Sequence, residues 1–173
     1  DVTEHVVSFQ KRRNLTSQVL GEVPLDLPPQ TLRTQATWWT IPHAVLTERG
    51  IADIAGCVHA AEHAAIGLLP LFTMCDRNDI GGVSMAEHPD TGQPTVFVYD
   101  GYTGGAGFTW HGFAVAAEWL SATRETIVSC SCSSGCPGCV QSPKCGNNNK
   151  PLDKEAAKML LEGFEPNSHG NEE

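Results

Sequence analysis

The apolar positions at the start of the chain lack a helical period. Three extended segments, Val2–Phe9, Gln18–Val23 and Thr34–Ile41, are separated by Lys11–Asn14 and by a stretch at 24–30 that holds three prolines. Prolines at this density exclude a helix interior, and Lys11–Asn14 has the composition of a connecting turn. The first 41 residues are therefore predicted to form an antiparallel meander.

A helical period begins at Asp53 and runs to Pro70. Because this segment holds many alanines and few charges, the helix is expected to be buried on most sides. Its apolar positions recur at steps of three and four: Ile54, Cys57, Val58, Ala61, Ala65, Ile66 and Leu69.

The second half of the chain alternates between strand and helix signals. Thr95–Tyr99 lacks polar alternation and is predicted to be a central strand, followed by a glycine-rich loop at 100–107 and a helix at 110–123. A last helix is expected after Pro151, with Asp153 as its N-cap, ending near residue 163.

These elements predict an α+β fold: antiparallel strands packed on a buried central helix, a strand–glycine loop–helix unit, and a four-cysteine zinc knuckle. The chain has 173 residues and 40% hydrophobic composition, which suffices for one core. A single domain is expected over 1–163 with a disordered polar tail at 164–173. Since the chain starts with Asp and with strand-like sequence, we interpret it as an excised domain.

Charge limits the partners that the whole surface can attract. The formal net charge is -9, so the domain should repel a phosphate backbone, and any nucleic-acid contact has to be local. We identify no targeting signal and no apolar stretch of the roughly 18 to 20 residues that a membrane span needs. The expectation is a cytoplasmic protein without a membrane partner.

Five of the seven cysteines lie between positions 130 and 145, a spacing that suits a metal better than disulfides. Zinc prefers four thiolates at tetrahedral corners, and the Cys136-Pro-Gly-Cys139 turn presents two of them. Two ligand sets are possible. One is Cys130, Cys132, Cys136 and Cys139, and the other replaces Cys130 with Cys145. We favour the first set because its loops close at little entropic cost. With four protein ligands the site would be structural.

A second metal motif lies on the predicted central helix. His59-Ala-Ala-Glu62-His63 matches the His-x-x-Glu-His pattern of inverted zinc metallopeptidases, in which the histidines bind zinc and the glutamate activates water. Such an enzyme also needs a third ligand and an open cleft. We favour the simpler interpretation that His59 and His63 are buried polar groups, hydrogen-bonded to neighbours such as Asp76, Arg77 or Asp79.

The glycine-rich loop follows a strand and precedes a helix, as phosphate-binding loops do. No Gly-Lys-Ser/Thr follows Gly107, so the loop is not a nucleotide-hydrolysing P-loop, and the spacing of dinucleotide-binding loops is not met. The sequence favours a tight strand-to-helix connection.

Few residues are suited to touch nucleic acid. Lys144 and Lys150 flank the end of the cysteine cluster, and Lys11, Arg12 and Arg13 lie in the first turn. These cations could bind phosphate, although a solvated surface charge is the simpler interpretation of each. Trp38, Trp39 and Tyr102 could stack on bases, with core packing favoured for the two tryptophans.

Several long motifs together resemble the C-terminal zinc-binding domain of bacterial superfamily 2 DNA helicases of the mitomycin-repair-factor type. The resemblance covers about residues 1 to 162. It rests on the following segments: His59 to Ile66, Pro70 to Phe72, Cys75 to Arg77, Asp79 to Gly82, Tyr99 to Gly107, Gly135 to Asn147, and Pro151 to Lys154.

The resemblance implies a parent protein with two motor domains that hydrolyse ATP and move 3′ to 5′ on single-stranded DNA during DNA repair. This chain would dock on those motor domains, help to hold the strand, and act in the bacterial nucleoid. The family's zinc ligands would fall in the cysteine cluster. Because no motor motif is present here, the fragment alone is not expected to be an enzyme. A zinc metallopeptidase and a protein-interaction module without DNA binding are the alternatives.

Overall fold

The long helix predicted after Asp53 is the centre of the molecule. The computed structural model describes residues 1–16 and 18–162, and helix α2 spans Ile54–Thr73. The Asp53 side chain caps it by accepting a hydrogen bond from the Gly56 N–H at 2.9 Å. We expected the helix to end at Pro70, which was wrong. Pro70 removes only one backbone N–H donor from the helix. The helix ends one turn later at Met74, which has left-handed backbone angles and donates its N–H to the Pro70 carbonyl.

Helix α2 is also long and apolar enough to cross a membrane by length and composition, against our expectation that no stretch reaches that length. Within the stretch that passes this test, 67% of the residues are buried inside the protein. The core helix of a folded domain passes the same test, and burial among the other elements accounts for the apolar composition of α2.

A three-stranded antiparallel sheet covers one side of α2. Its order is β5 (Ala36–Thr40), β7 (Thr95–Asp100), β6 (Ile80–Met85), so the strand predicted to be central is central. Strand β6 was missed because two glycines gave it the composition of a loop. The second of them, Gly82, lets sheet and helix approach closely, since a Cβ there would lie 2.4 Å from the Ile66 Cδ1 atom.

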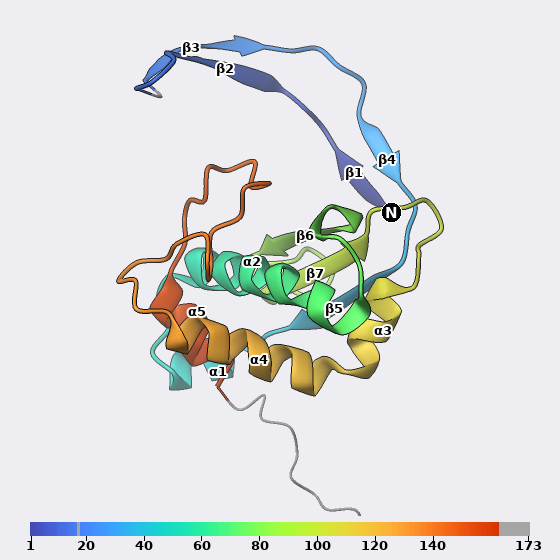
Figure 1. Ribbon diagram of the computed structural model, residues 1–173, viewed down its shortest axis with the longest axis vertical. Helices are drawn as coiled ribbons and strands as arrows, with labels where there is room; N and C mark the ends of the chain where they lie inside the picture. The colour runs from blue at the N-terminus through green and yellow to red at the C-terminus, as the bar shows by residue number, and fades with distance from the viewer. Residues whose placement is uncertain (17, 163–173) are drawn as a thin grey trace, which may run out of the picture.

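Other helices pack on further sides of α2 (Figure 1). Short α1 (His43–Glu48) follows Pro42, and 3₁₀ helix η1 (Arg77–Asp79) precedes β6. One helix was predicted over 110–123, but the chain forms α3 (Phe108–Ala114) and α4 (Ala116–Ser129), which meet at Val115. Helix α5 (Lys154–Leu160) begins after its predicted cap, Asp153. The predicted domain limit at 163 and the tail 164–173 lie outside the described residues.

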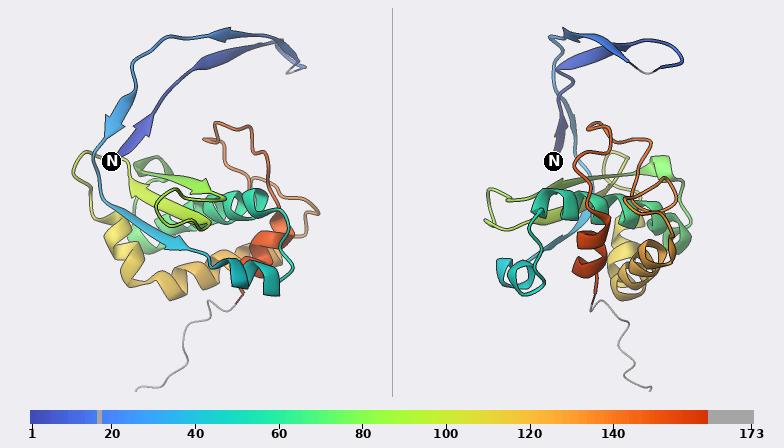
Figure 2. Two further views of the ribbon diagram at one scale, coloured as in Figure 1. Left: turned by 180° about the vertical axis from the view of Figure 1, so that it is seen from behind. Right: turned by 90° about the vertical axis from the view of Figure 1, so that its left-hand side faces the viewer.

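The N-terminal strands form an arm that stands away from this core (Figures 1 and 2). In the arm, β1 (Val2–Glu4) pairs with β4 (Gln30–Leu32), and β2 (Ser8–Arg12) pairs with β3 (Val19–Pro24). The predicted meander is therefore wrong in topology, because its third strand, β5, pairs with β7 instead. No described residue of these four arm strands is buried.

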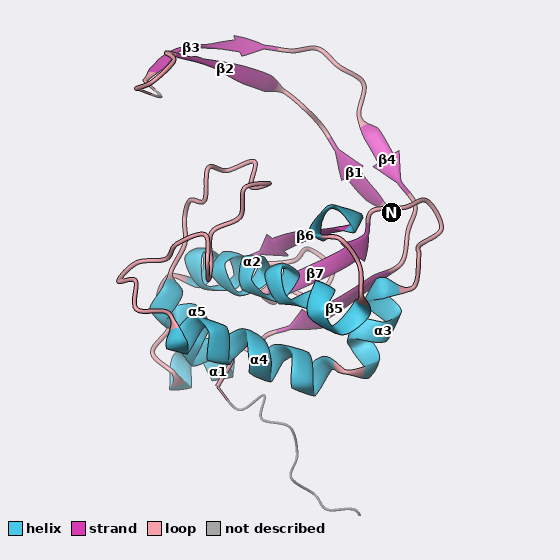
Figure 3. Cartoon of the chain, in the orientation of Figure 1, coloured by secondary structure: helices cyan, strands magenta, loops and turns pink. Residues whose placement is uncertain are grey.

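The α+β class with antiparallel strands on a buried central helix is confirmed (Figure 3). The sheet packs on α2, with α4 and α5 on other sides of the same helix. The loop between α4 and α5, residues 130–153, carries the five clustered cysteines and lies against the first half of α2.

Candidate metal centre

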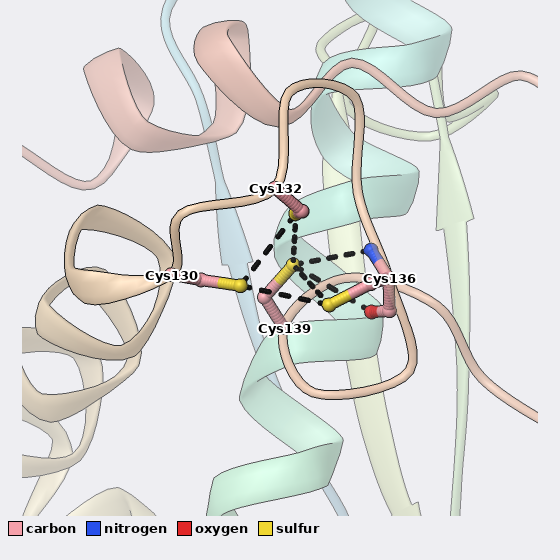
Figure 4. A group of neighbouring side chains, drawn as sticks. All are labelled: Cys130, Cys132, Cys136 and Cys139. Atoms are coloured by element: carbon pink, nitrogen blue, oxygen red, sulfur yellow. Dashed lines mark hydrogen bonds between the residues drawn. The ribbon is translucent and has the colours of Figure 1, made fainter.

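Four cysteines gather where α4 ends (Figure 4). Cys130 is the C-cap of α4, and Cys132 follows as the chain turns away from the helix. A tight turn then brings Cys136 and Cys139 together, closed by the Cys139 N–H donating to the Cys136 carbonyl at 3.0 Å. Gly135 enters this turn at a φ of 108°, in the left-handed region that favours glycine.

The sulfur positions match a tetrahedral zinc site. The Cys130 Sγ lies 3.5 Å from the sulfurs of Cys132 and Cys136, and the Cys139 Sγ lies 3.5 Å from Cys132 and 3.8 Å from Cys136. Zn–S bonds of about 2.3 Å at tetrahedral angles place sulfurs about 3.8 Å apart. All four ligand atoms lie within 4.8 Å of one another. The residues present therefore fit a four-thiolate zinc ion.

Lys154 holds the loop around these sulfurs, and sequence reasoning did not single it out. Its ammonium donates to the carbonyls of Cys130 and Cys132, both at 2.7 Å, and lies 3.5 Å from the Cys132 sulfur. The side chain is only 5% exposed. A buried cation beside four thiolates offsets part of the net negative charge of a zinc–tetrathiolate centre. The sequence signal was its place at the end of the Pro151 to Lys154 segment and at the first position of α5.

The thiols of the cluster share their protons unequally: burial raises the pKa of Cys139 to about 12, whereas the pKa of Cys132 is lowered. Burial acts to raise the pKa of the Cys132 thiol, but hydrogen bonds from Cys139, Cys130 and Cys136 outweigh it and lower this pKa to about 7. A thiol that ionises near neutral pH gives up its proton readily to a metal.

Cys145, the fifth sulfur, is not part of this group. It lies instead beside the histidines of α2, with its Sγ 3.4 Å from the Nε2 atom of His59. The rings of His59 and His63 meet edge to face, with centroids 4.3 Å apart and an angle of 63° between their planes. One ligand atom from each of these three residues lies within 4.8 Å of the other two.

Both histidines are buried and hydrogen-bonded, as the simpler interpretation held, but the expected partners at 76–79 were wrong. The His59 Nδ1 donates to the Pro151 carbonyl at 2.7 Å, and the His63 Nδ1 donates to the Val140 carbonyl at 2.9 Å. These partners belong to the 130–153 loop, which packs on this part of α2. Burial and the neighbouring His59 lower the pKa of His63 to about 4, so its ring is neutral at pH 7.

A cavity of about 270 Å³ opens beside the histidines. Glu62 lines it and accepts a hydrogen bond from the Ser84 hydroxyl at 2.6 Å. Burial raises the pKa of Glu62 to about 7, against the opposing effect of that hydrogen bond. The cavity also contacts His59, His63 and Cys145. A candidate third ligand, Cys145, and the open space that the His-x-x-Glu-His motif requires thus lie beside the two histidines.

The glycine-rich loop wraps a carboxylate of its own chain. Asp100, which is fully buried, accepts hydrogen bonds from the backbone N–H groups of Ala106 at 2.6 Å, Gly107 at 2.7 Å and Thr109 at 2.9 Å. Because this side chain occupies the place where a phosphate would lie, the loop is the tight connection that the sequence favoured.

The candidate phosphate-binding residues differ in their surroundings. Lys11, Arg12 and Arg13 lie exposed near the end of the arm, and we call them the basic tip. The Arg12 guanidinium donates to the Asn148 side chain at 2.9 Å, which links the arm to the 130–153 loop. Lys150 is also exposed.

Lys144 is the exception among these cations. Its ammonium donates to the backbone carbonyls of Arg77 at 3.2 Å and Ile80 at 3.0 Å, across to the start of β6. These two contacts show that Lys144 fastens the 130–153 loop to the sheet, whatever else it binds.

The three candidate aromatic residues also lie in different environments. Trp39 packs edge-on against Trp119 of the core, with centroids 5.9 Å apart. Trp38 points to the opposite face of the sheet, is 58% exposed and stacks on Phe97. Tyr102 is half exposed, and its hydroxyl donates to the Asp79 carboxylate at 2.5 Å. Core packing, the interpretation that the sequence favoured for both tryptophans, therefore holds for Trp39 and is wrong for Trp38.

Comparison with known proteins places this geometry in a family. Residues 61–140 match the family model described as the MrfA Zn-binding domain, a region that includes the four clustered cysteines and ends before Cys145. The uncharacterized ATP-dependent helicase YprA of Bacillus subtilis is 33% identical over 145 residues, which are 81% of this chain and 19% of the helicase.

Two further relatives differ in length. The uncharacterized protein MJ1572.1 of Methanocaldococcus jannaschii is 37% identical over 108 residues, which are 61% of this chain and 96% of that protein. The crystal structure of the helicase MrfA bound to DNA superposes with a TM-score of 0.61 at 28% identity, over 90% of this chain and 20% of MrfA. The chain thus spans about a fifth of the helicases it matches and nearly all of MJ1572.1.

Proposed function

Because this chain belongs to the family of MrfA Zn-binding domains, whose metal is zinc, we propose that it is the zinc-stabilised accessory module of an ATP-dependent DNA helicase. In this role it holds single-stranded DNA during 3′ to 5′ translocation in DNA repair, in the cytoplasmic nucleoid. The chain itself supplies contacts to DNA and to the motor domains, while ATP hydrolysis belongs to those domains. The similarity to a helicase that was crystallised with DNA supports the proposal.

The zinc ligands in this proposal are Cys130, Cys132, Cys136 and Cys139. Their mutual sulfur distances, the buried Lys154 and the end of the family match at residue 140 all favour this set over one that includes Cys145. Zinc supplies a rigid cross-link in the 130–153 loop, and with four protein ligands it leaves no position for a substrate.

The observation that carries the DNA-binding role is the basic tip. Three adjacent cations project on an arm from a protein with a net charge of -9, so phosphate is attracted to this place and repelled elsewhere. The hydrogen bond from Arg12 to Asn148 ties the arm to the zinc loop, where Lys150 adds another exposed cation. A strand bound between the arm and this loop would meet positive charge on both sides.

Docking on the motor domains is assigned to an exposed apolar surface on the far side of the sheet from α2. We call it the apolar face. A shallow cavity of about 320 Å³ beside Trp38 joins β5 to α3, and a second cavity of about 470 Å³ joins Trp38 to the β6 residues Val83 and Met85. An exposed apolar patch of this kind marks a protein interface, and the motor domains of the same protein are the partner we infer. Its exposed members are Trp38, Val83, Met85, Trp110 and Phe113.

The DNA-binding role is tested in the full-length protein. A variant with Lys11→Ala, Arg12→Ala and Arg13→Ala should bind single-stranded DNA more weakly, and its log affinity should depend less steeply on log salt concentration, by about 2 for three lost phosphate contacts. Fluorescence anisotropy over a salt series measures both. The control, Arg33→Ala with Lys158→Ala, removes two cations outside the basic tip that pair with acidic neighbours on the surface. Equal affinity and slope in both variants would contradict the proposal.

Docking is tested separately by oxidative footprinting of the full-length protein. Trp38 and Met85 should be protected from hydroxyl radicals, whereas Met74, which is 96% exposed and outside the apolar face, should be oxidised freely. Oxidation of Trp38 and Met85 at the rate of Met74 would show that no domain covers this surface.

A further inference from the structure

Three potential metal ligands meet from distant parts of the chain, outside the four-cysteine cluster. His59 and His63 lie one turn apart on α2, and Cys145 approaches them from the 130–153 loop. Their ligand atoms lie within 4.8 Å of one another, with 3.4 Å between the His59 Nε2 and the Cys145 Sγ. A tetrahedral zinc ion bound by one imidazole and one thiolate holds these two atoms about 3.6 Å apart.

The histidines are oriented as metal ligands are. A backbone carbonyl can only accept a hydrogen bond, so the contacts to Pro151 and Val140 require a proton on Nδ1 of each ring, and in the tautomer that can bind a metal Nε2 has none. The Nε2 atom of each ring then carries the free lone pair. Metal-binding histidines usually fix their tautomer by donating the other N–H to a carbonyl or carboxylate, and both histidines here do so.

The sulfur of Cys145 is also prepared as a ligand. The Asn149 N–H donates to it at 3.3 Å, the same distance at which the Cys136 N–H donates to the Cys139 sulfur in the four-cysteine cluster. The Asn149 side chain fastens the loop by exchanging two hydrogen bonds with the Ser142 backbone, at 2.7 and 3.1 Å. A simple thiol–imidazole hydrogen bond would account for Cys145 and His59, but it would not require His63 as well.

The space beside these ligands leaves room for a fourth ligand. The cavity of about 270 Å³ contacts all three residues and is also lined by Glu62 and Ser84. Three protein ligands with an open position facing a polar cavity are the arrangement of an exchangeable zinc site, whereas the four-cysteine cluster is closed.

We propose that His59, His63 and Cys145 bind a second zinc ion, with its fourth position open to water or a small anionic ligand in the cavity beside Glu62. Nitrogen and thiolate ligands in a tetrahedral arrangement favour zinc over magnesium or calcium, which prefer oxygen. This site goes beyond the helicase role proposed above, and either proposal can fail without the other. Two of its three ligands, His59 and Cys145, lie outside the region that matches the family model.

The test is the zinc content of the purified protein, measured by inductively coupled plasma mass spectrometry after loading with Zn²⁺ and removal of excess. Wild-type protein should hold two zinc ions per chain. Cys145→Ser should hold one, and Cys132→Ser should lose the other one. Cys75→Ser, whose sulfur lies in neither group, serves as the matched control and should retain both. A wild-type protein that holds one zinc after loading, unchanged in Cys145→Ser, would overturn the proposal.

X-ray absorption at the zinc edge of the loaded wild-type protein gives an answer that needs no variant. Two sites, one with four sulfurs and one with a single sulfur, give an average of roughly 2.5 sulfur ligands per zinc, with imidazole scattering. An average of about four sulfurs without an imidazole signal would exclude zinc at the histidines even if the Cys145→Ser variant failed to fold.

Discussion

The four-cysteine cluster and the His59–His63–Cys145 group have similar kinds of metal ligands, but the ligands are separated by very different distances along the sequence. The first takes its ligands from ten consecutive positions, 130–139, while the second joins one turn of α2 to a sulfur more than eighty residues later. Each uses a backbone N–H to support a sulfur. One group is closed on itself, and the other faces a cavity.

This difference indicates a structural cross-link at the four-cysteine cluster and an exchangeable ligand at the histidine group. A zinc ion held by four thiolates shapes a loop that has little other regular structure, so its loss should unfold that loop. The histidine group is supported by a buried helix whose packing does not depend on a metal, because α2 contacts the sheet, α4 and α5 directly. Zinc should therefore dominate stability at the first group and matter less for the fold at the second.

The largest effect is expected when each group loses one sulfur. Cys132→Ser should release the structural zinc and lower Tm on the order of 10 °C or more, because the 130–153 loop loses its cross-link. Cys145→Ser should lower Tm by a few degrees at most, since α2 remains packed. Differential scanning calorimetry of both variants beside Cys75→Ser measures this. Equal losses of Tm in the first two would contradict the division into structural and exchangeable sites.

A smaller effect is expected at Lys154, which acts on the first group only. Lys154→Met leaves the carbonyls of Cys130 and Cys132 without their buried cation and should weaken zinc retention about 10- to 100-fold. Competition with a chromophoric chelator measures this affinity. The control Lys158→Met removes an exposed lysine that pairs with Glu155 on the same helix and should have no measurable effect. Weakened retention in both variants would show that the effect is only one of net charge.

The smallest effect is expected at a loop that is held without any metal. The Asp100 carboxylate accepts hydrogen bonds from three backbone N–H groups. Burial opposes its ionisation, but these hydrogen bonds outweigh burial and keep the pKa of Asp100 below its ordinary value. Asp100→Asn should lower the free energy of unfolding by about 1 to 3 kcal/mol at pH 7. The folded state favours the ionised form, so this contribution is present above the unfolded pKa of about 4 and is lost as pH falls through the lower folded pKa.

Urea unfolding of wild type and Asp100→Asn between pH 7 and pH 3 measures the gap between the two proteins. Effects of acid on zinc binding are common to both and cancel in the difference. The gap should be constant above about pH 5 and should shrink below about pH 4. A gap that does not change with pH would show that the ionised carboxylate does not hold the glycine-rich loop.

Local patterns were sufficient for several elements. The period of apolar residues predicted α2, the apolar run predicted central strand β7, and Asp153 marked the start of α5, because each depends on neighbours in sequence. Two elements were predicted wrongly because they depend on contacts with distant parts of the chain. Strand β6 is a strand because it pairs with β7, and the predicted 110–123 helix breaks at Val115 where α3 and α4 take different directions.

The amino-acid sequence alone determined the α+β class, the zinc-binding character of 130–139 and the cations of the basic tip, since these follow from residue types at short spacing. Only the tertiary structure decided that the arm leaves the core, that Lys154 supports the cysteine loop, and that Cys145 faces the histidines of α2. Those features depend on which distant segments pack together. A spacing of more than eighty residues carries no geometric information until the chain is folded.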